Sequence, residues 1–130
     1  MKYLSDYTED LLSEAFKKNG AFFAFSDDQL NEKKVDGVEY ASMGMGLICP
    51  KDNCKQMRAD ILEIGKLGRE MDVAENGRDK IIERELYNHE AFYTMDIEDT
   101  FNVLECYGIT ENEIRVVYNN LLARDDHDNF

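Results

Sequence analysis

The sequence lacks any segment of the kind that directs a chain into or across a membrane. No apolar run in its 130 residues approaches the roughly 18 to 20 residues that a bilayer-spanning helix needs. The amino-terminal segment MKYLSDYTEDLL has no hydrophobic centre like that of a signal peptide, and its acidic residues are unlike those of mitochondrial transit peptides. We therefore expect a cytoplasmic protein.

Cysteine and histidine are scarce. An odd number of cysteines, three, without an export signal indicates reduced thiols. Cys49 and Cys54 are five residues apart, which is not the spacing of a zinc knuckle or a CxxC redox pair. Together with Cys106 and either His89 or His127 they complete a four-ligand zinc set on paper, but buried structural thiols are the favoured interpretation. We predict no metal and no cofactor.

Positive charge is also scarce. The chain has 15 Lys and Arg against 28 Asp and Glu, a net charge of −13. The deficit deepens along the chain, because residues 85–130 contain eleven Asp or Glu and only two Arg, a net charge of −9. Such a charge repels nucleic acids and anionic membranes and attracts basic protein surfaces, although acidity can also serve solubility alone.

The apolar residues, 43% of the chain, are spaced as in a globular protein. Helical periodicity predicts helices over residues 4–18, 27–34, 51–75, 78–88, 97–106 and 111–123. Short apolar segments between turn residues predict strands over residues 21–25, 38–49 and 91–94. We expect an α+β fold, a single domain over residues 1–124 whose small, about three-stranded sheet packs against five to six helices around one core. Residues 125–130 are predicted to form a flexible acidic tail.

Two capping boxes predict helix starts. In Ser26-Asp27-Asp28-Gln29 and in Thr110-Glu111-Asn112-Glu113, the hydroxyl can accept the amide hydrogen three residues later. The fourth side chain of each box can reach back toward the backbone.

A pair of glycines one residue apart, Gly44 and Gly46, lies in the segment YASMGMGLICPKDN. A dinucleotide-binding loop needs a third glycine where Cys49 stands, and the predicted helix begins too late for that loop. The favoured interpretation is a central strand whose one face lacks side chains, so that another backbone, a helix or a ligand can approach.

A ligand site near these glycines is the alternative that the sequence leaves open. Its polar groups would be Tyr40, His89 and Tyr93, beside the space left by Gly44 and Gly46. His89 is the strongest candidate base, with Glu85 one helical turn earlier as its partner. A helix-terminal histidine stabilised by the helix dipole explains the same pattern.

The main functional hypothesis is a non-enzymatic interaction protein. Two predicted helices, over 97–106 and 111–123, would display their carboxylates to a basic groove, for example on a nucleic-acid-binding enzyme. The predicted partner-binding residues are Glu98, Asp99, Glu105, Glu111 and Glu113. A third hypothesis is a regulatory or structural subunit that forms a homodimer through an apolar strip.

Three segments carry a resemblance to other proteins: LYNHEAFYTMDIED, AFFAFS and GLICPKDN. They resemble an uncharacterised family of small acidic proteins of phages and gut bacteria, and the resemblance covers most of the chain. It implies a phage or mobile-element origin. In type, the chain is similar to phage inhibitors of host defence, such as anti-CRISPR or antirestriction proteins, some of which imitate the charge of nucleic acid.

Overall fold

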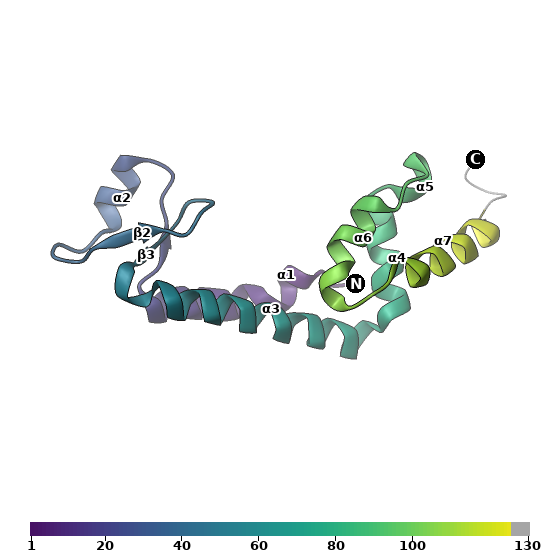
Figure 1. Cartoon of the computed structure of the whole chain (residues 1–130), viewed down its shortest axis with the longest axis horizontal. Helices are drawn as coiled ribbons and strands as arrows, with labels where there is room; N and C mark the ends of the chain where they lie inside the picture. The colour runs from purple at the N-terminus through teal and green to yellow at the C-terminus, as the bar shows by residue number, and fades with distance from the viewer. Residues whose placement is uncertain (126–130) are drawn as a thin grey trace. The chain divides into compact units, whose positions relative to one another are not determined.

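The structure, a computed structural model, describes residues 1–125 (Figure 1). The chain begins with α1 (Leu4–Asn19), β1 (Phe22–Phe23), α2 (Asp27–Lys33), β2 (Tyr40–Ser42) and β3 (Leu47–Pro50). A short 3-10 helix, η1 (Lys51–Asn53), leads into the longest helix, α3 (Cys54–Asn76). The remainder consists of α4 (Arg78–Asn88), α5 (Ala91–Thr94), α6 (Glu98–Leu104), the 3-10 helix η2 (Glu105–Tyr107) and α7 (Glu111–Asp125). The predicted α+β class is confirmed.

The chain divides into two compact units, one formed by Met1–Glu70 and the other by Met71–Phe130. Each unit has its own hydrophobic cluster, so the structure has two clusters where the sequence predicted one core. The unit boundary falls inside α3. Within residues 1–125, no helix combines the length and the apolar character that a membrane span requires. Except for Asp125, which ends α7, the predicted acidic tail lies outside the described residues.

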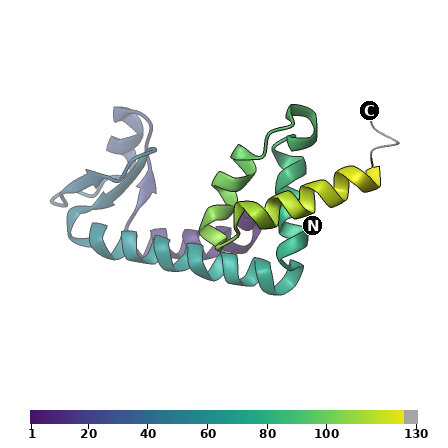
Figure 2. The ribbon, with the colours of Figure 1, turned by 45° about the vertical axis from the view of Figure 1, so that its right-hand side comes forward.

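The first unit contains a three-stranded antiparallel sheet in the order β1-β3-β2. Its cluster is formed by Ala15 of α1, Cys49 of β3, and Met57 and Ile64 of α3. In Figures 1 and 2, α1 and α3 lie along one another. The apolar side chains of these helices therefore meet each other and one face of the sheet.

The single long strand predicted over 38–49 is wrong, because the chain reverses in its middle. Gly44, Met45 and Gly46 all have positive φ angles, of 94°, 53° and 83°. The Leu47 amide donates to the Gly44 carbonyl (3.0 Å), and β2 and β3 pair on either side of the turn. Glycine tolerates this left-handed backbone, which explains the glycine pair as turn chemistry rather than as a bare strand face.

The buried strand predicted over 21–25 is shorter and more exposed than expected. Only Phe22 and Phe23 are paired, and the Phe25 side chain is 73% exposed. β1 is an edge strand, and the Lys33 Nζ donates to the outward carbonyl oxygen of Phe23 (2.7 Å). A lysine at a sheet edge is a common protection against pairing with another chain.

Helices α1 and α3 approach each other closely at Gly68. A Cβ atom placed on Gly68 would lie 2.3 Å from the Thr8 Cγ2 and 3.3 Å from the Leu4 Cδ1. Gly65, one turn earlier on α3, has only the end of the Arg69 side chain nearby, at 3.2 Å. Close packing against α1 therefore requires a glycine at position 68, whereas no such contact requires one at position 65.

We expect Gly68→Ala to destabilise the protein and Gly65→Ala to stabilise it. The first forces α1 and α3 apart, and overpacking of this kind costs about 1 to 3 kcal/mol. The second gains only helix propensity, about 1 kcal/mol. Urea unfolding followed by circular dichroism compares the two variants. Equal midpoints would contradict a special role for the contact at Gly68.

The second unit packs α4 against α6 and α7 (Figure 2). Its cluster contains the fully buried side chains of Ile81, Ile82 and Leu86 on α4, Leu104 on α6 and Ile114 on α7. The predicted capping box at Thr110 is confirmed. The Glu113 amide donates to the Thr110 Oγ1 (3.2 Å), and the Thr110 amide donates to the Glu113 carboxylate (3.3 Å).

The strand predicted over 91–94 is wrong, because this segment is the short helix α5. Glu90 and Met95, at its two ends, have left-handed backbones with φ angles of 54° and 59°. The Thr94 amide donates to the Glu90 carbonyl, and the Met95 amide donates to the Ala91 carbonyl. The backbone hydrogen bonds of α5 are thus satisfied locally, while Ala91 and Phe92 pack on the core.

Candidate interaction surface

The negative charge is concentrated in the second unit. Residues 71–130 contain 15 Asp or Glu and five Lys or Arg, a net charge of −10. Residues 1–70 contain 13 acidic and ten basic residues, a net charge of −3. The stretch 85–114 contains eight Asp or Glu and no Lys or Arg at all. Most of the surplus of negative charge therefore belongs to the second unit.

Three of the five predicted partner-binding residues form what we call the acidic face: Glu98 and Asp99 on α6, and Glu105 on η2. All three side chains are exposed, while Ile97, Thr100 and Leu104 of the same segment are buried. Among residues 1–125, none of the three carboxylates belongs to an ion pair. Glu98 and Glu105 are seven residues apart, about two helical turns along the continuous segment of α6 and η2, so they lie on about the same side of it.

The other two predicted residues are engaged within the protein. Glu113 accepts two hydrogen bonds from the Arg78 guanidinium, at 3.0 and 2.8 Å. These bonds outweigh its slight desolvation and hold the pKa of Glu113 below its usual value. Glu111 pairs with Arg115 at 2.7 Å, one helical turn along α7. Charges that are already neutralised contribute less to the attraction of a partner than those of the acidic face.

Asp96 belongs to the fold rather than to the acidic face. Its Oδ1 accepts the amide hydrogen of Glu98 (2.9 Å), and so satisfies an otherwise open donor at the start of α6. Glu98 and Asp99 occupy the first turn of the same helix, where the helix dipole favours carboxylates. The fold of α6 therefore tolerates the concentration of negative charge that a basic partner would meet.

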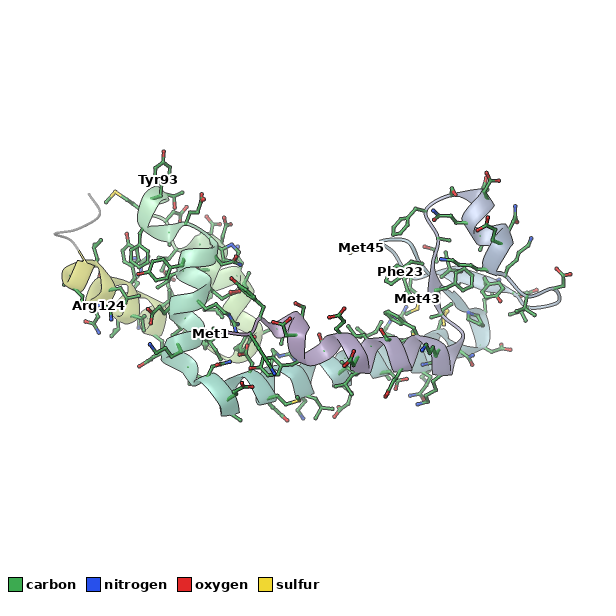
Figure 3. The ribbon with its side chains drawn as sticks, turned by 180° about the vertical axis from the view of Figure 1, so that it is seen from behind. Met1, Phe23, Met43, Met45, Tyr93 and Arg124 are labelled. Carbon is green, nitrogen blue, oxygen red and sulfur yellow. The ribbon has the colours of Figure 1, made fainter. Side chains whose placement is uncertain are left out.

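An aromatic pocket lies at the end of α4 and on α5, before α6 in the chain. It is a shallow cavity of about 350 Å³, lined by Tyr87, Glu90, Phe92 and Tyr93. Figure 3 shows Tyr93 projecting from the end of its unit, and the side chain is 87% exposed. Of these four residues only Tyr93 was predicted from the sequence, because residues 91–94 have the pattern of a strand and not of a helix. Three aromatic residues within a span of seven were the available signal.

Beneath these surfaces, the second unit contains a buried charged network centred on Asp72 of α3. Its carboxylate accepts bidentate hydrogen bonds from Arg84 of α4 (3.0 and 3.0 Å). It also accepts from the Tyr107 hydroxyl (2.6 Å) and from the Asn76 amide (2.8 Å). Burial raises the pKa of Asp72, but these hydrogen bonds outweigh burial and hold the pKa below its usual value. The network joins α3, α4 and η2 and is a structural element.

The predicted ligand site is not assembled within either unit. Tyr40, Gly44 and Gly46 belong to the first unit, whereas His89 and Tyr93 belong to the second. The space expected beside Gly46 is filled, since a Cβ there would lie 2.2 Å from the Phe25 ring. The Tyr40 hydroxyl accepts the amide hydrogen of Val35 (3.0 Å), which gives it a role in holding a loop.

His89 lies at the carboxyl end of α4, as the alternative interpretation of the sequence had it. Its Nε2 atom is buried and has no hydrogen-bond partner among the described residues. The carboxylate predicted as its partner, that of Glu85, is instead 3.5 Å from the Arg84 guanidinium. The structure therefore provides no Glu85–His89 pair for general base catalysis.

The cysteines are free thiols. Cys49 is buried as predicted, and burial together with the neighbouring Cys54 raises the pKa of its thiol to about 11. Cys106 is exposed, against the expectation of buried thiols. No three His, Cys, Asp or Glu side chains come together as a metal site would require, within the part of the chain that the structure describes. His127 lies outside that part.

The first unit exposes large apolar side chains at its sheet. Figure 3 shows Phe23, Met43 and Met45 near one another around the β2–β3 hairpin, and Met45 is 95% exposed. The Phe23 and Phe25 rings stack at a centroid distance of 6.2 Å. The homodimer stays a prediction of the sequence. Light scattering tests that prediction.

Comparison with known proteins identifies a family but no activity. A model described as "Family of unknown function (DUF7659)" matches residues 4–124. No curated protein and no solved structure matches the chain. The match spans residues of both units.

Proposed function

The chain belongs to DUF7659, a family of unknown function, and we propose that it is a non-enzymatic protein that binds a basic surface of another protein through its acidic second unit. The observation that carries the proposal is the acidic face. Glu98, Asp99 and Glu105 are exposed on one helical segment, and no Lys or Arg occurs between residues 85 and 114 to neutralise them. Exposed carboxylates without neighbouring positive charges attract and orient a cationic partner.

The partner that fits this chemistry best is a protein with a basic groove, such as a nucleic-acid-binding enzyme. Such grooves are lined by Lys and Arg because they neutralise phosphates. An acidic protein bound there would compete with nucleic acid and inhibit the enzyme. The resemblance to phage and gut-bacterial proteins supports a phage-encoded inhibitor that acts on a host defence protein in the host cytoplasm.

The test is capture of a partner from a lysate of the cell in which the chain acts. The immobilised protein is compared with the variant Glu98→Lys, Asp99→Lys, Glu105→Lys. We expect the wild-type chain to retain a basic protein at low ionic strength and to release it at high ionic strength, because salt screens exposed charges. The triple variant should retain nothing.

The matched control is the variant Glu9→Lys, Asp10→Lys, Glu14→Lys on α1. It has the same net charge as the first variant, but the exposed carboxylates that it replaces belong to the first unit. We expect it to capture the partner as the wild-type chain does. Equal loss in both variants would mean that total charge, and not the acidic face, determines binding.

A further inference from the structure

The aromatic pocket is built from rings that the fold holds in place. Phe92 stacks on Tyr118 of α7, with ring centroids 5.0 Å apart and an interplanar angle of 12°. Phe92 also contacts Tyr87, with ring centroids 5.0 Å apart and an interplanar angle of 39°. Two of the three rings that line the pocket are therefore part of a packed aromatic group. The third, Tyr93, is almost fully exposed and contributes little to the core.

Glu90 supplies the one carboxylate that lines this pocket. It is exposed and belongs to no ion pair among residues 1–125. Glu90 lies between α4 and α5 and has a left-handed backbone. In the chain it follows Tyr87 and precedes Phe92 and Tyr93. The pocket thus combines three aromatic side chains with one carboxylate that belongs to no ion pair among residues 1–125.

We propose that this pocket binds a single arginine side chain of the partner protein. The inference rests on the proposed function and names the group that the partner inserts. A cation over aromatic faces is attracted by the ring quadrupoles, and a carboxylate beside the rings adds direct charge pairing. Arginine fits better than lysine, because its flat guanidinium stacks on rings and forms paired hydrogen bonds with a carboxylate.

The surrounding charge selects for a cation over other ligands. Between residues 85 and 114 there is no Lys or Arg to pair with an anion, and eight carboxylates repel one. A neutral apolar side chain would leave the Glu90 charge without a partner. The acidic face, which follows the pocket in the sequence, supplies the longer-range attraction that brings a basic surface to it.

The test uses N-acetyl-arginine amide as the probe and N-acetyl-citrulline amide as the matched control. Citrulline has nearly the same shape as arginine but no charge. Both are titrated into the full chain while the ring resonances of Tyr87, Phe92 and Tyr93 are followed by NMR. We expect saturable shifts with the arginine compound and none with the citrulline compound.

Two variants locate the effect. Tyr93→Ala and Glu90→Gln replace exposed side chains, and each should weaken binding of the arginine compound by about fivefold or more. Glu105→Gln removes a carboxylate that does not line the pocket, and it should bind as the wild-type chain does. Equal shifts with citrulline, unchanged binding in both pocket variants, or no shift at all would each overturn the proposal.

The outcome is separable from that of the proposed function. If charge reversal on the acidic face abolishes partner capture while the pocket variants bind the arginine compound normally, the proposed function stands and the arginine pocket does not. If the pocket binds arginine while charge reversal leaves capture intact, the pocket stands and the acidic face does not carry the binding.

Discussion

Asp72→Asn is expected to lower the free energy of unfolding of the second unit by about 3 to 5 kcal/mol, the usual cost of breaking a buried ion pair from one side. Asp72 is fully buried and Arg84 nearly so. Asparagine keeps the shape of the side chain but removes the charge that compensates the guanidinium. It also places an amide group where Arg84, Tyr107 and Asn76 now donate hydrogen bonds. The remaining contact of Arg84 with Glu85, at 3.5 Å, is a poorer substitute.

Urea unfolding by circular dichroism measures this loss, and hydrogen exchange assigns it to the second unit. Tyr107→Phe is the graded control, since it deletes one hydrogen bond and leaves the ion pair. It should cost about 1.5 kcal/mol. A loss below about 1 kcal/mol for Asp72→Asn would show that the network contributes little, because a buried pair of this kind has offsetting desolvation.

The same residue makes stability depend on pH in the acid range. The pKa of Asp72 is lower in the folded protein than its ordinary value, which in an unfolded chain is about 3.9. Its contribution is therefore fully present above that ordinary pKa and is lost as pH falls through the lowered folded pKa. We expect Asp72→Asn to remove this part of the acid dependence, which unfolding curves at several pH values would show.

Charge reversal of Glu98, Asp99 and Glu105 to lysine is expected to slow association with the captured partner by about 10-fold to 1,000-fold at low ionic strength. This is the range over which electrostatic steering changes association rates. The substitutions change the net charge from −13 to −7, and the whole change falls on one helical segment. Dissociation should change less, because exposed charges act mainly during the approach.

Surface plasmon resonance at several salt concentrations measures the effect, with the α1 triple variant as the control of equal net charge. The rates of the two variants should converge as salt rises, since screening removes the difference between them. Lysine at the first turn of α6 also opposes the helix dipole, at about 0.3 to 1 kcal/mol per residue. Circular dichroism must therefore confirm the helix content of the variant before rates are compared.

Most helices were predictable from the sequence because their ends have local causes. α1 ends at Asn19, and Gly20 follows it in the left-handed conformation that glycine adopts easily. The Ser26 hydroxyl accepts the Gln29 amide hydrogen at the start of α2. Such signals depend on two to four adjacent residues. They do not depend on what the rest of the chain does.

The sequence predictions were wrong where contacts between residues far apart in the chain determine the local structure or the burial of a side chain. A segment such as 91–94 has strand-like residues, but Phe92 finds its ring partner, Tyr118, on α7. On α3, the apolar Met71 is exposed, whereas the next residue, the charged Asp72, is buried. Only the presence of Arg84 and Tyr107 around that position makes a carboxylate more favourable there than a thioether.

The candidate site shows the same division. The charge surplus after residue 85 was visible in the composition, and the structure places Glu98, Asp99 and Glu105 on one segment. The pairing of Glu113 with Arg78 could not be predicted from spacing, because Arg78 lies 35 residues earlier in the chain. The aromatic pocket needed the two left-handed residues, Glu90 and Met95, which no propensity predicts at a non-glycine position.

The ammonium group of Lys33 affects the tendency of the protein to aggregate through its edge strand. While it is bound to the Phe23 carbonyl, it occupies an outward acceptor of the edge strand β1, beside two exposed phenylalanine rings. Acetylation of that amine would remove both its charge and its charge-assisted hydrogen bond to the Phe23 carbonyl. The chain would then present an unpaired, apolar strand edge to other copies of itself. We therefore expect the Lys33 hydrogen bond to oppose edge-to-edge aggregation.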